Sequence, residues 1–276
     1  MRGRSRSMPA HMSAAMRKLE ELSGVINLAI QTVDARAPNL TRCDFIIRAL
    51  PGCSQVTLVT KADLADPKAL KEWLAHFERE GIPTLVFPHS NRAPREKFIE
   101  KIRRASGAPE NVRAAVIGLP NVGKSTVMNY IVGKRSVRVG AQPGITRAVQ
   151  LVNAGGNFVL VDTPGVVTPQ FARREHGLSL ALLGCLQDSF FNPDEAALHL
   201  LARSLPFYCR IFNEYYDVET ETCDPVEFCE AVARRRGMLR KGGKLDLDRV
   251  YPLIVQDFST GRIFGVSLEA PPAAPA

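Results

Sequence analysis

Residues 118–125 read GLPNVGKS and fit the phosphate-binding pattern G-x-x-x-x-G-K-[S/T]. In such a loop the glycines let backbone N–H groups close on phosphate oxygens, Lys124 reaches the terminal phosphates, and Ser125 offers a hydroxyl to Mg²⁺. An apolar run comes directly before the pattern, and the helix expected after it points its positive end at the anion. The segment predicts an NTPase or a kinase, and by itself it does not select the base.

Two further segments could complete a magnesium site. The residues DTPG at 162–165 follow an apolar run, so Asp162 could bind the magnesium shell while the N–H of Gly165 senses a terminal phosphate. The alternative is a plain turn, since Asp-x-Pro-Gly is good turn chemistry. Thr146, in the segment PGIT between the two motifs, could place a second hydroxyl on the metal.

The segment TKAD at residues 60–63 ends another apolar run and can choose a base. The carboxylate of Asp63 can accept two hydrogen bonds from the N1–H and N2–H₂ edge of guanine, and adenine lacks that pair of donors. The segment PHSN at 88–91 closes the next run, where the Ser90 N–H could hold the guanine oxygen, although this segment alone says little. The positions predicted to bind GTP in these two segments are Thr60, Lys61, Ala62, Asp63, His89 and Ser90.

Five apolar runs lead into these loops, and amphipathic segments separate them. The runs cover residues 25–35, 55–63, 84–90, 112–120 and 157–165, and helical patterns occupy 66–81 and 95–105. Such alternation predicts an α/β fold, in which a mainly parallel sheet has helices on both faces. Ligands of these sheets bind at the carboxyl ends of the strands, where the loops above lie.

The strand pattern stops after about residue 170. Three helix-periodic segments follow, and Pro193 and Pro225 lie near the starts of two of them. The expected organisation is an α/β nucleotide-binding domain over residues 1–173, a small helical domain over 174–268 and a disordered tail over 269–276.

The 276 residues are 45% apolar and 23% charged, which is ordinary for a globular protein. No stretch approaches the roughly 18–20 uninterrupted apolar residues that a membrane span needs. The six cysteines include no C-x-x-C pair, which argues against a zinc site or a disulfide framework. The first seven residues are basic without an apolar run, so we expect no secretory signal and a cytoplasmic protein, with the mitochondrial matrix as the alternative.

The net charge of +8 is concentrated in two places. Residues 1–19 carry five bases and no acid, and residues 232–249 carry seven bases against two acids. Clustered bases indicate a polyanion as partner, and a solvated helix face is the alternative. The positions predicted to contact RNA are Arg234, Arg235, Arg236, Arg240, Lys241 and Lys244.

The order of the motifs is diagnostic, because the base-reading segment TKAD comes before the phosphate loop instead of after it. The same loops would form around the site if the chain were cut at another point and its original ends were joined. Such a permutation is tolerated because the termini of a domain are often close together. The sequence resembles the circularly permuted GTPases, and specifically the ribosome biogenesis GTPase A family (the YlqF/RbgA type). The resemblance rests on PAHM (9–12), VDARAP (33–38), TKAD, GLPNVGKST, PGIT and DTPG, and on residues 234–250 and 257–269.

The resemblance implies a permuted GTPase domain followed by a helical RNA-binding domain. It also implies a monomer that binds GTP and GDP with Mg²⁺ and hydrolyses GTP when the large ribosomal subunit stimulates it. The implied GTP contacts in and around the phosphate loop are Asn121, Val122, Gly123, Lys124, Ser125, Thr126, Thr146 and Gly165.

Two roles come from the resemblance alone. Ordinary small GTPases orient the attacking water with a glutamine after D-x-x-G, but Val166 stands at that position here. The family pattern points instead to His11 as the catalytic residue. Asn121 looks like the residue that helps to bind K⁺ in potassium-stimulated GTPases, and a loop-shaping asparagine is the alternative.

The chain departs from the family pattern at Thr60, where the family usually has asparagine, so we expect guanine specificity to be kept and affinity to fall. It also has SMPAHM at residues 7–12 where the family has WFPGHM, and His89 before Ser90 where asparagine is common. Two alternatives remain: an assembly factor that binds nucleotide with little turnover, and a non-ribosomal P-loop NTPase.

Overall fold

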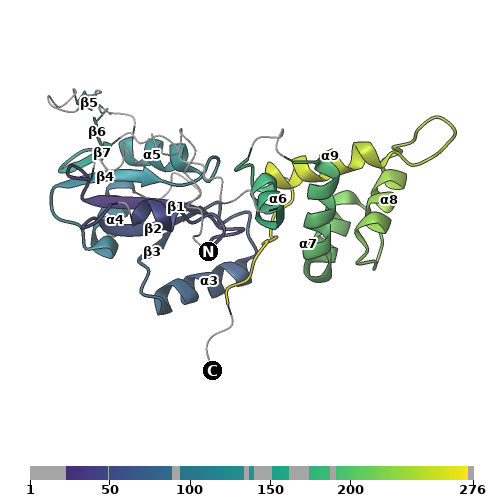
Figure 1. The fold of residues 1–276 in the computed structure, drawn as a ribbon, viewed down its shortest axis with the longest axis horizontal. Helices are drawn as coiled ribbons and strands as arrows, with labels where there is room; N and C mark the ends of the chain where they lie inside the picture. The colour runs from purple at the N-terminus through teal and green to yellow at the C-terminus, as the bar shows by residue number, and fades with distance from the viewer. Residues whose placement is uncertain are drawn as a thin grey trace, which may run out of the picture. The chain divides into compact units, whose positions relative to one another are not determined.

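The computed structural model describes residues 23–48, 50–88, 94–133, 137–139, 151–161, 174–186 and 191–272 (Figure 1). The chain forms two compact units. Unit 1 comprises Met1–Val33, Thr41–Thr60 and Phe77–Gln170, and unit 2 comprises Asp34–Leu40, Lys61–His76 and Phe171–Ala276. The units therefore interleave along the chain, whereas the domains expected at residues 1–173 and 174–268 are contiguous.

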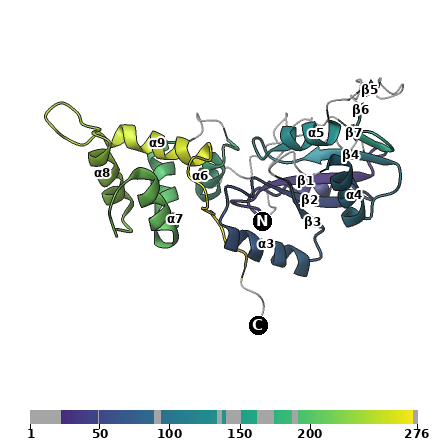
Figure 2. The same ribbon diagram turned by 180° about the vertical axis from the view of Figure 1, so that it is seen from behind.

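Unit 1 is built on a mixed sheet with the strand order β3-β2-β1-β4-β7-β6-β5 (Figures 1 and 2). The pairs β1–β4, β2–β3 and β4–β7 are parallel, and β5–β6 and β6–β7 are antiparallel. The predicted α/β fold with a mainly parallel sheet is confirmed. The strands are β1 (Leu28–Asp34), β2 (Ser54–Thr60), β3 (Thr84–Val86), β4 (Val112–Ile117), β5 (Val137–Val139), β6 (Leu151–Asn153) and β7 (Phe158–Val161).

Strand β1, which lies between β2 and β4, is buried along its whole length, as expected of a parallel strand covered on both faces. Its polar side chains therefore need partners inside the protein. Gln31 accepts a hydrogen bond from the Cys43 backbone N–H at 2.5 Å, and the Thr32 hydroxyl donates to the Ile117 carbonyl at 2.9 Å.

Two helices, α4 (Arg95–Ser106) and α5 (Lys124–Val132), pack against one face of the sheet. Their buried residues, Phe98 and Ile102 in α4 and Val127 and Ile131 in α5, join the core formed by the strands. Burying one such side chain contributes roughly 1.5–3 kcal/mol, so these four residues fix how the helices lie on the sheet.

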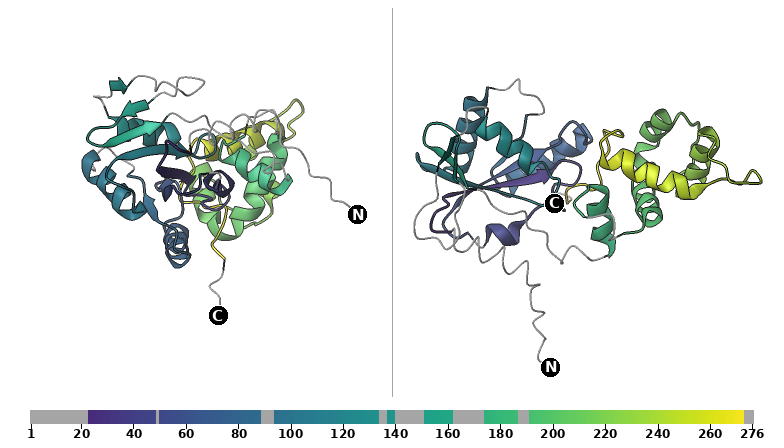
Figure 3. Two further views of the ribbon diagram at one scale, coloured as in Figure 1. Left: turned by 60° about the vertical axis from the view of Figure 1, so that its left-hand side comes forward. Right: turned by 90° about the horizontal axis from the view of Figure 1, so that it is seen from above.

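Unit 2 contains the helices α6 (Arg174–Leu182), α7 (Pro193–Tyr216), α8 (Pro225–Arg235) and α9 (Leu247–Ser259), which Figure 3 shows from two directions. The prolines noted in the sequence open α7 and α8. Before them, Asn192 accepts a hydrogen bond from the Asp194 N–H, and Asp224 accepts from the N–H groups of Val226 and Glu227. Helix α3 (Pro67–Arg79) begins in unit 2 and ends in unit 1, and the short helix α2 (Asp44–Ile47) lies in unit 1.

Helix α9 was not predicted from the sequence. Pro252 lies inside it, and an internal proline removes a helical hydrogen bond and argues locally against a helix. Tertiary packing compensates, because Val250, Ile254 and Phe258 are fully buried at a helical spacing of four.

Candidate functional site

Gly118 begins the phosphate loop at the end of β4, and only glycine fits there. A Cβ at this position would lie 2.3 Å from the Thr32 hydroxyl oxygen and 2.7 Å from the Thr32 carbonyl oxygen, both on β1. The hydroxyl is itself held by the Ile117 carbonyl, so it cannot move aside without losing that hydrogen bond. The first glycine of the motif is therefore required by the close approach of the loop to its neighbouring strand.

The rest of the loop turns tightly into α5. Asn121 and Gly123 have positive φ angles of 58° and 93°, and Gly123 is the residue before the first turn of the helix. Lys124 lies half-buried and its ammonium group donates to the Leu119 carbonyl at 2.5 Å, across the loop. The order strand, tight turn and helix is the one that the sequence pattern predicts for a phosphate loop.

The other predicted contacts of the loop follow from this turn. Val122 is fully buried and anchors the loop, whereas Ser125 and Thr126 are exposed in the first turn of α5. An exposed serine hydroxyl at the start of this helix suits the predicted role of Ser125 as a hard oxygen ligand for Mg²⁺. Asn121 to Thr126 thus run through the loop into the first turn of α5.

Thr60 connects the end of β2 to the phosphate loop. Its hydroxyl lies 2.6 Å from the Val122 carbonyl and 2.9 Å from the Val33 carbonyl, and the residue is 3% exposed. A hydroxyl has one proton to donate, so it serves one carbonyl at a time, whereas an asparagine amide has two N–H donors. Thr60 is among the GTP-binding positions predicted from the sequence and was noted as a variant position, but this contact was not predicted.

In unit 2, Lys61 forms an ion pair with a fully buried carboxylate. Its ammonium group lies 2.9 Å from Asp34 at the end of β1, and Arg36 lies 2.8 Å from the same carboxylate oxygen. Burial raises the pKa of Asp34, but the charges and hydrogen bonds of Arg36 and Lys61 lower it, and the net pKa lies below its ordinary value.

Sequence reasoning missed the roles of Asp34 and Arg36. The signal was present, since two opposite charges follow directly on an apolar strand in VDARAP, a segment used only for the resemblance. Charged residues are almost never fully buried unless they are paired, so two charges at the inner end of a buried strand indicate an ion pair.

The turn after Lys61 presents Asp63 to solvent. The Leu64 N–H donates to the Lys61 carbonyl at 3.0 Å and closes the turn, while Lys61 itself has a positive φ of 53°. Asp63 is exposed and Ala62 is half-buried. This geometry leaves the carboxylate of Asp63 accessible to a ligand.

The described ranges do not include every predicted site residue. The residues that lie outside them are His11, His89, Ser90, Thr146, Asp162 and Gly165. Within the described ranges, no group of three or more His, Cys, Asp or Glu side chains could hold a metal ion.

The predicted RNA-contacting bases lie around the end of α8 and the turn after it. Four of them already have partners: Arg234 pairs with Glu230, Arg235 with Asp217, and Arg240 with Asp246 and Asp248, while Arg236 lies over the Tyr216 ring at 5.6 Å. Lys241 and Lys244 are exposed on a turn with Gly242 and Gly243, whose φ angles are 84° and 77°. The turn is closed by the Arg240 N–H, which donates to the Lys244 carbonyl at 2.8 Å.

The apolar residues Val226, Phe228 and Val232 of α8 predict an inward-facing side of this helix, and for Val226 that prediction is wrong. Val226 is 41% exposed, while Phe228 and Val232 are fully buried. Val226 lies in the first turn, directly after Pro225, where the Asp224 cap and not packing determines the backbone.

The fold is that of a P-loop GTPase: a mainly parallel sheet carries a phosphate loop between β4 and α5. The order of its motifs is permuted, because the segment TKAD, predicted to read the base, comes earlier in the chain. The family model described as "50S ribosome-binding GTPase" matches residues 113–202. In the described residues, no helix is long and apolar enough to cross a membrane.

The chain is 33% identical over 275 residues to the ribosome biogenesis GTPase A of Bacillus pumilus, covering 95% of this chain and 97% of that protein. It is 31% identical to the Thermotoga maritima protein of the same name, covering 95% of this chain and 93% of that one. The GNP-bound crystal structure of YlqF from T. maritima is similar with a TM-score of 0.66 and 26% identity, covering 94% and 99% of the two chains. The protein belongs to the ribosome biogenesis GTPase A family.

Proposed function

We propose that this protein assists assembly of the large ribosomal subunit and that the subunit stimulates its hydrolysis of GTP to GDP and phosphate. The observation that carries the proposal is that relatives named for ribosome biogenesis align over 95% of the chain. The phosphate loop supports nucleotide binding, and the name of the relatives, ribosome biogenesis GTPase A, supports hydrolysis over a role limited to binding.

The metal and nucleotide contacts form part of the proposal. Ser125, Thr146 and Asp162 would hold Mg²⁺, which would supply positive charge to the phosphates, and Lys124 would pair with the terminal phosphates. Asn121 is the proposed K⁺ position, and its positive φ of 58° equally suits a loop-shaping role. Comparing turnover in K⁺ with turnover in Na⁺ separates the two roles.

Guanine selection rests on Asp63, with His89 and Ser90 beside the base. Asp63→Asn turns one acceptor into a donor, so the variant should reject GTP and accept xanthosine triphosphate. Unmet hydrogen bonds cost roughly 1–3 kcal/mol each, enough for a large change in specificity. Equilibrium binding of both nucleotides checks this, and unaltered GTP affinity in the variant would remove the base-reading role.

The decisive experiment measures GTP turnover with and without purified large ribosomal subunits. We expect stimulation by the large subunit, no comparable turnover of ATP, and a loss of about 10²–10⁴-fold of the stimulated rate in His11→Ala at near-normal GTP affinity. Binding without stimulated turnover would favour an assembly factor that only binds nucleotide. A wild-type rate in His11→Ala would show that another group orients the water.

The organisation of the chain is also proposed: a GTPase domain over residues 1–173, an RNA-binding domain over 174–268 and a disordered tail over 269–276, except that Glu269 accepts hydrogen bonds from the N–H groups of Asn39 and Leu40. Limited proteolysis with mass spectrometry tests the boundaries. A monomer in the cytoplasm, with the mitochondrial matrix as the alternative, fits the proposed role, and sedimentation and cell fractionation test those two assignments.

A further inference from the structure

A buried carboxylate in unit 2 holds the start of the base-reading turn, defined here as residues 61–66. Asp34 accepts hydrogen bonds from three groups of Arg36: the backbone N–H at 3.0 Å, Nε at 3.0 Å and Nη2 at 2.8 Å. The Lys61 ammonium completes the set at 2.9 Å. Because Asp34 and Arg36 are both 0% exposed, this network places Lys61 with little freedom.

Arg36 links this carboxylate to the end of α9. Its Nη1 donates to the Phe258 carbonyl at 2.8 Å, and its guanidinium lies over the Phe258 ring at 4.9 Å. A cation at the last carbonyls of a helix is favourable, since the helix dipole is negative there. The Arg36 carbonyl also accepts from the Leu268 N–H at 2.8 Å, so the chain after α9 is held by the same residue.

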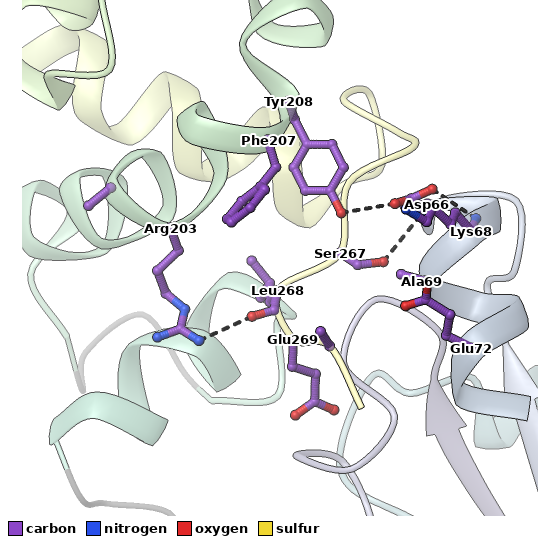
Figure 4. Close-up of a pocket in the computed structure, with 12 residues that line it drawn as sticks. Asp66, Lys68, Ala69, Glu72, Arg203, Phe207, Tyr208, Ser267, Leu268 and Glu269 are labelled. Carbon is purple, nitrogen blue, oxygen red and sulfur yellow. Dashed lines mark hydrogen bonds between the residues drawn. The ribbon is translucent and has the colours of Figure 1, made fainter. Parts of the chain in front are cut away.

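The end of the turn is held by a second set of contacts. The Gly265 N–H donates to the Leu64 carbonyl at 2.8 Å, and the Asp66 N–H donates to the Ser267 hydroxyl at 3.2 Å. The Tyr208 hydroxyl of α7 donates to the Asp66 carboxylate at 3.1 Å, as Figure 4 shows. Burial, together with the Asp66 charge and hydrogen bond, raises the pKa of Tyr208 to about 12, so this hydroxyl remains a donor at neutral pH.

Asp63 lies between these two anchored ends and is exposed itself. An exposed carboxylate can meet two donors of a planar base only if its backbone is held in place before binding. We propose that Asp34, Arg36 and Tyr208 are positioning residues for guanine recognition. They hold the base-reading turn from both ends, so that Asp63 faces the N1–H and N2–H₂ edge of the base.

This inference rests on the proposed role of Asp63, and its test uses inosine triphosphate. Hypoxanthine lacks the 2-amino group, so Asp63 can accept only one hydrogen bond from it, while the phosphates are unchanged. The ratio of ITP to GTP dissociation constants therefore reports how well Asp63 is placed, separately from binding by the phosphate loop.

Arg36→Lys keeps the charge but loses the planar guanidinium, whose N–H groups bond both the Asp34 carboxylate and the Phe258 carbonyl. We expect GTP affinity to fall about tenfold more than ITP affinity, because GTP loses two hydrogen bonds to a displaced Asp63 and ITP loses one, so that the ratio approaches one. Tyr208→Phe removes a single hydroxyl at the other end of the turn and should lower the ratio several-fold in the same direction. This milder variant tests the inference even if Arg36→Lys does not fold.

The matched control is Arg262→Lys. Arg262 also pairs with a buried carboxylate of unit 2, Asp257, at 3.0 Å, and this pair is not part of the network around the base-reading turn. We expect the ratio to stay at its wild-type value in this variant.

The outcomes are distinct. If the wild-type protein does not prefer GTP to ITP, the proposed role of Asp63 fails. If it does, and folded Arg36→Lys or Tyr208→Phe keeps the preference, the positioning role is overturned. If the variants lose affinity for GTP and ITP equally, these residues contribute to stability alone, and the positioning role is overturned.

Discussion

The ionisation of the Asp34 carboxylate is opposed by its burial and favoured by the neighbouring charges of Arg36 and Lys61. Because its net pKa in the folded protein is below the ordinary value of about 3.9, its ionisation stabilises the fold at pH values above the unfolded pKa. That stabilisation is lost as the pH falls through the lower, folded pKa, so the affected window lies below about pH 4.

Asp34→Asn should show this window directly. Removing one partner of a buried pair costs about 3–5 kcal/mol, because Arg36 is left buried without its counter-charge. Urea unfolding of wild type and variant should differ by that amount from pH 5 to 7, and the difference should shrink below pH 4. A difference independent of pH would mean that the variant loses packing instead of charge pairing.

Single residues also mark the limit of sequence reasoning. Gly118, Lys124 and Ser125 belong to one local pattern, so their places were predictable from eight consecutive residues. The partners of Thr60 and Arg36 were not, because the Thr60 hydroxyl contacts a carbonyl 62 residues away and Arg36 contacts one 222 residues away. Such pairings depend on the register of whole strands and helices, which local patterns do not contain.

At the scale of elements, each of the five predicted apolar runs contains a strand, because long buried runs have a clear signal. The strands β5 and β6 have three residues each and were missed. Helix α9 was missed because Pro252 interrupts its pattern. Strands as short as β5 and β6, and a helix that depends on packing, have too little local signal for prediction.

The end of β2 provides a test at this scale. Thr60→Val removes the hydroxyl that reaches the phosphate loop, and we expect a loss of about 1–2 kcal/mol in the free energy of unfolding together with weaker GTP binding. The matched control is Thr57→Val, on the same strand and also 3% exposed. Calorimetric unfolding and nucleotide titration measure both effects.

If Thr57→Val weakens GTP binding as much as Thr60→Val, the hydroxyl contact with the Val122 carbonyl has no special role. The expected difference between the variants is in nucleotide affinity, because only Thr60 touches the phosphate loop.

At the scale of the whole molecule, the strand order of the sheet explains how motifs in a permuted order can belong to one domain. β1 and β4 pair in parallel at Leu28 and Ala114, far apart in sequence, so the segments before and after this pair share one sheet. The base-reading segment and the phosphate loop then follow the carboxyl ends of strands of the same sheet, as the sequence predicted. The interleaved units were not predictable, since they depend on contacts made by residues 34–40 and 61–76 with the end of the chain.

The exposed lysines Lys241 and Lys244, on the turn after α8, should control how the whole protein associates with the ribosome. Lys241→Ala with Lys244→Ala should weaken binding to large subunits and make its dependence on salt shallower by about two phosphate contacts. GTP binding by the free protein should not change. The arginines of the cluster are weaker choices, because three of them already pair with carboxylates and Arg236 lies over the Tyr216 ring.

The control removes two exposed lysines of α4, Lys97 and Lys101, and so makes the same change in net charge. Sedimentation with large subunits at several salt concentrations measures both double variants. If the two variants behave alike, net charge and not the turn governs association, and the basic cluster is a solvated surface.

The contact between Asp66 and Ser267 spans 201 residues, which has a consequence for the order of events during synthesis. At about 5–20 residues per second, the base-reading turn leaves the translating ribosome roughly 10–40 seconds before the segment that holds it. A nascent chain halted before α9 should therefore bind GTP and ITP almost equally, and the preference should appear only when residues 258–268 have emerged. A protein that assists ribosome assembly would then acquire its selectivity for guanine only as its own translation finishes.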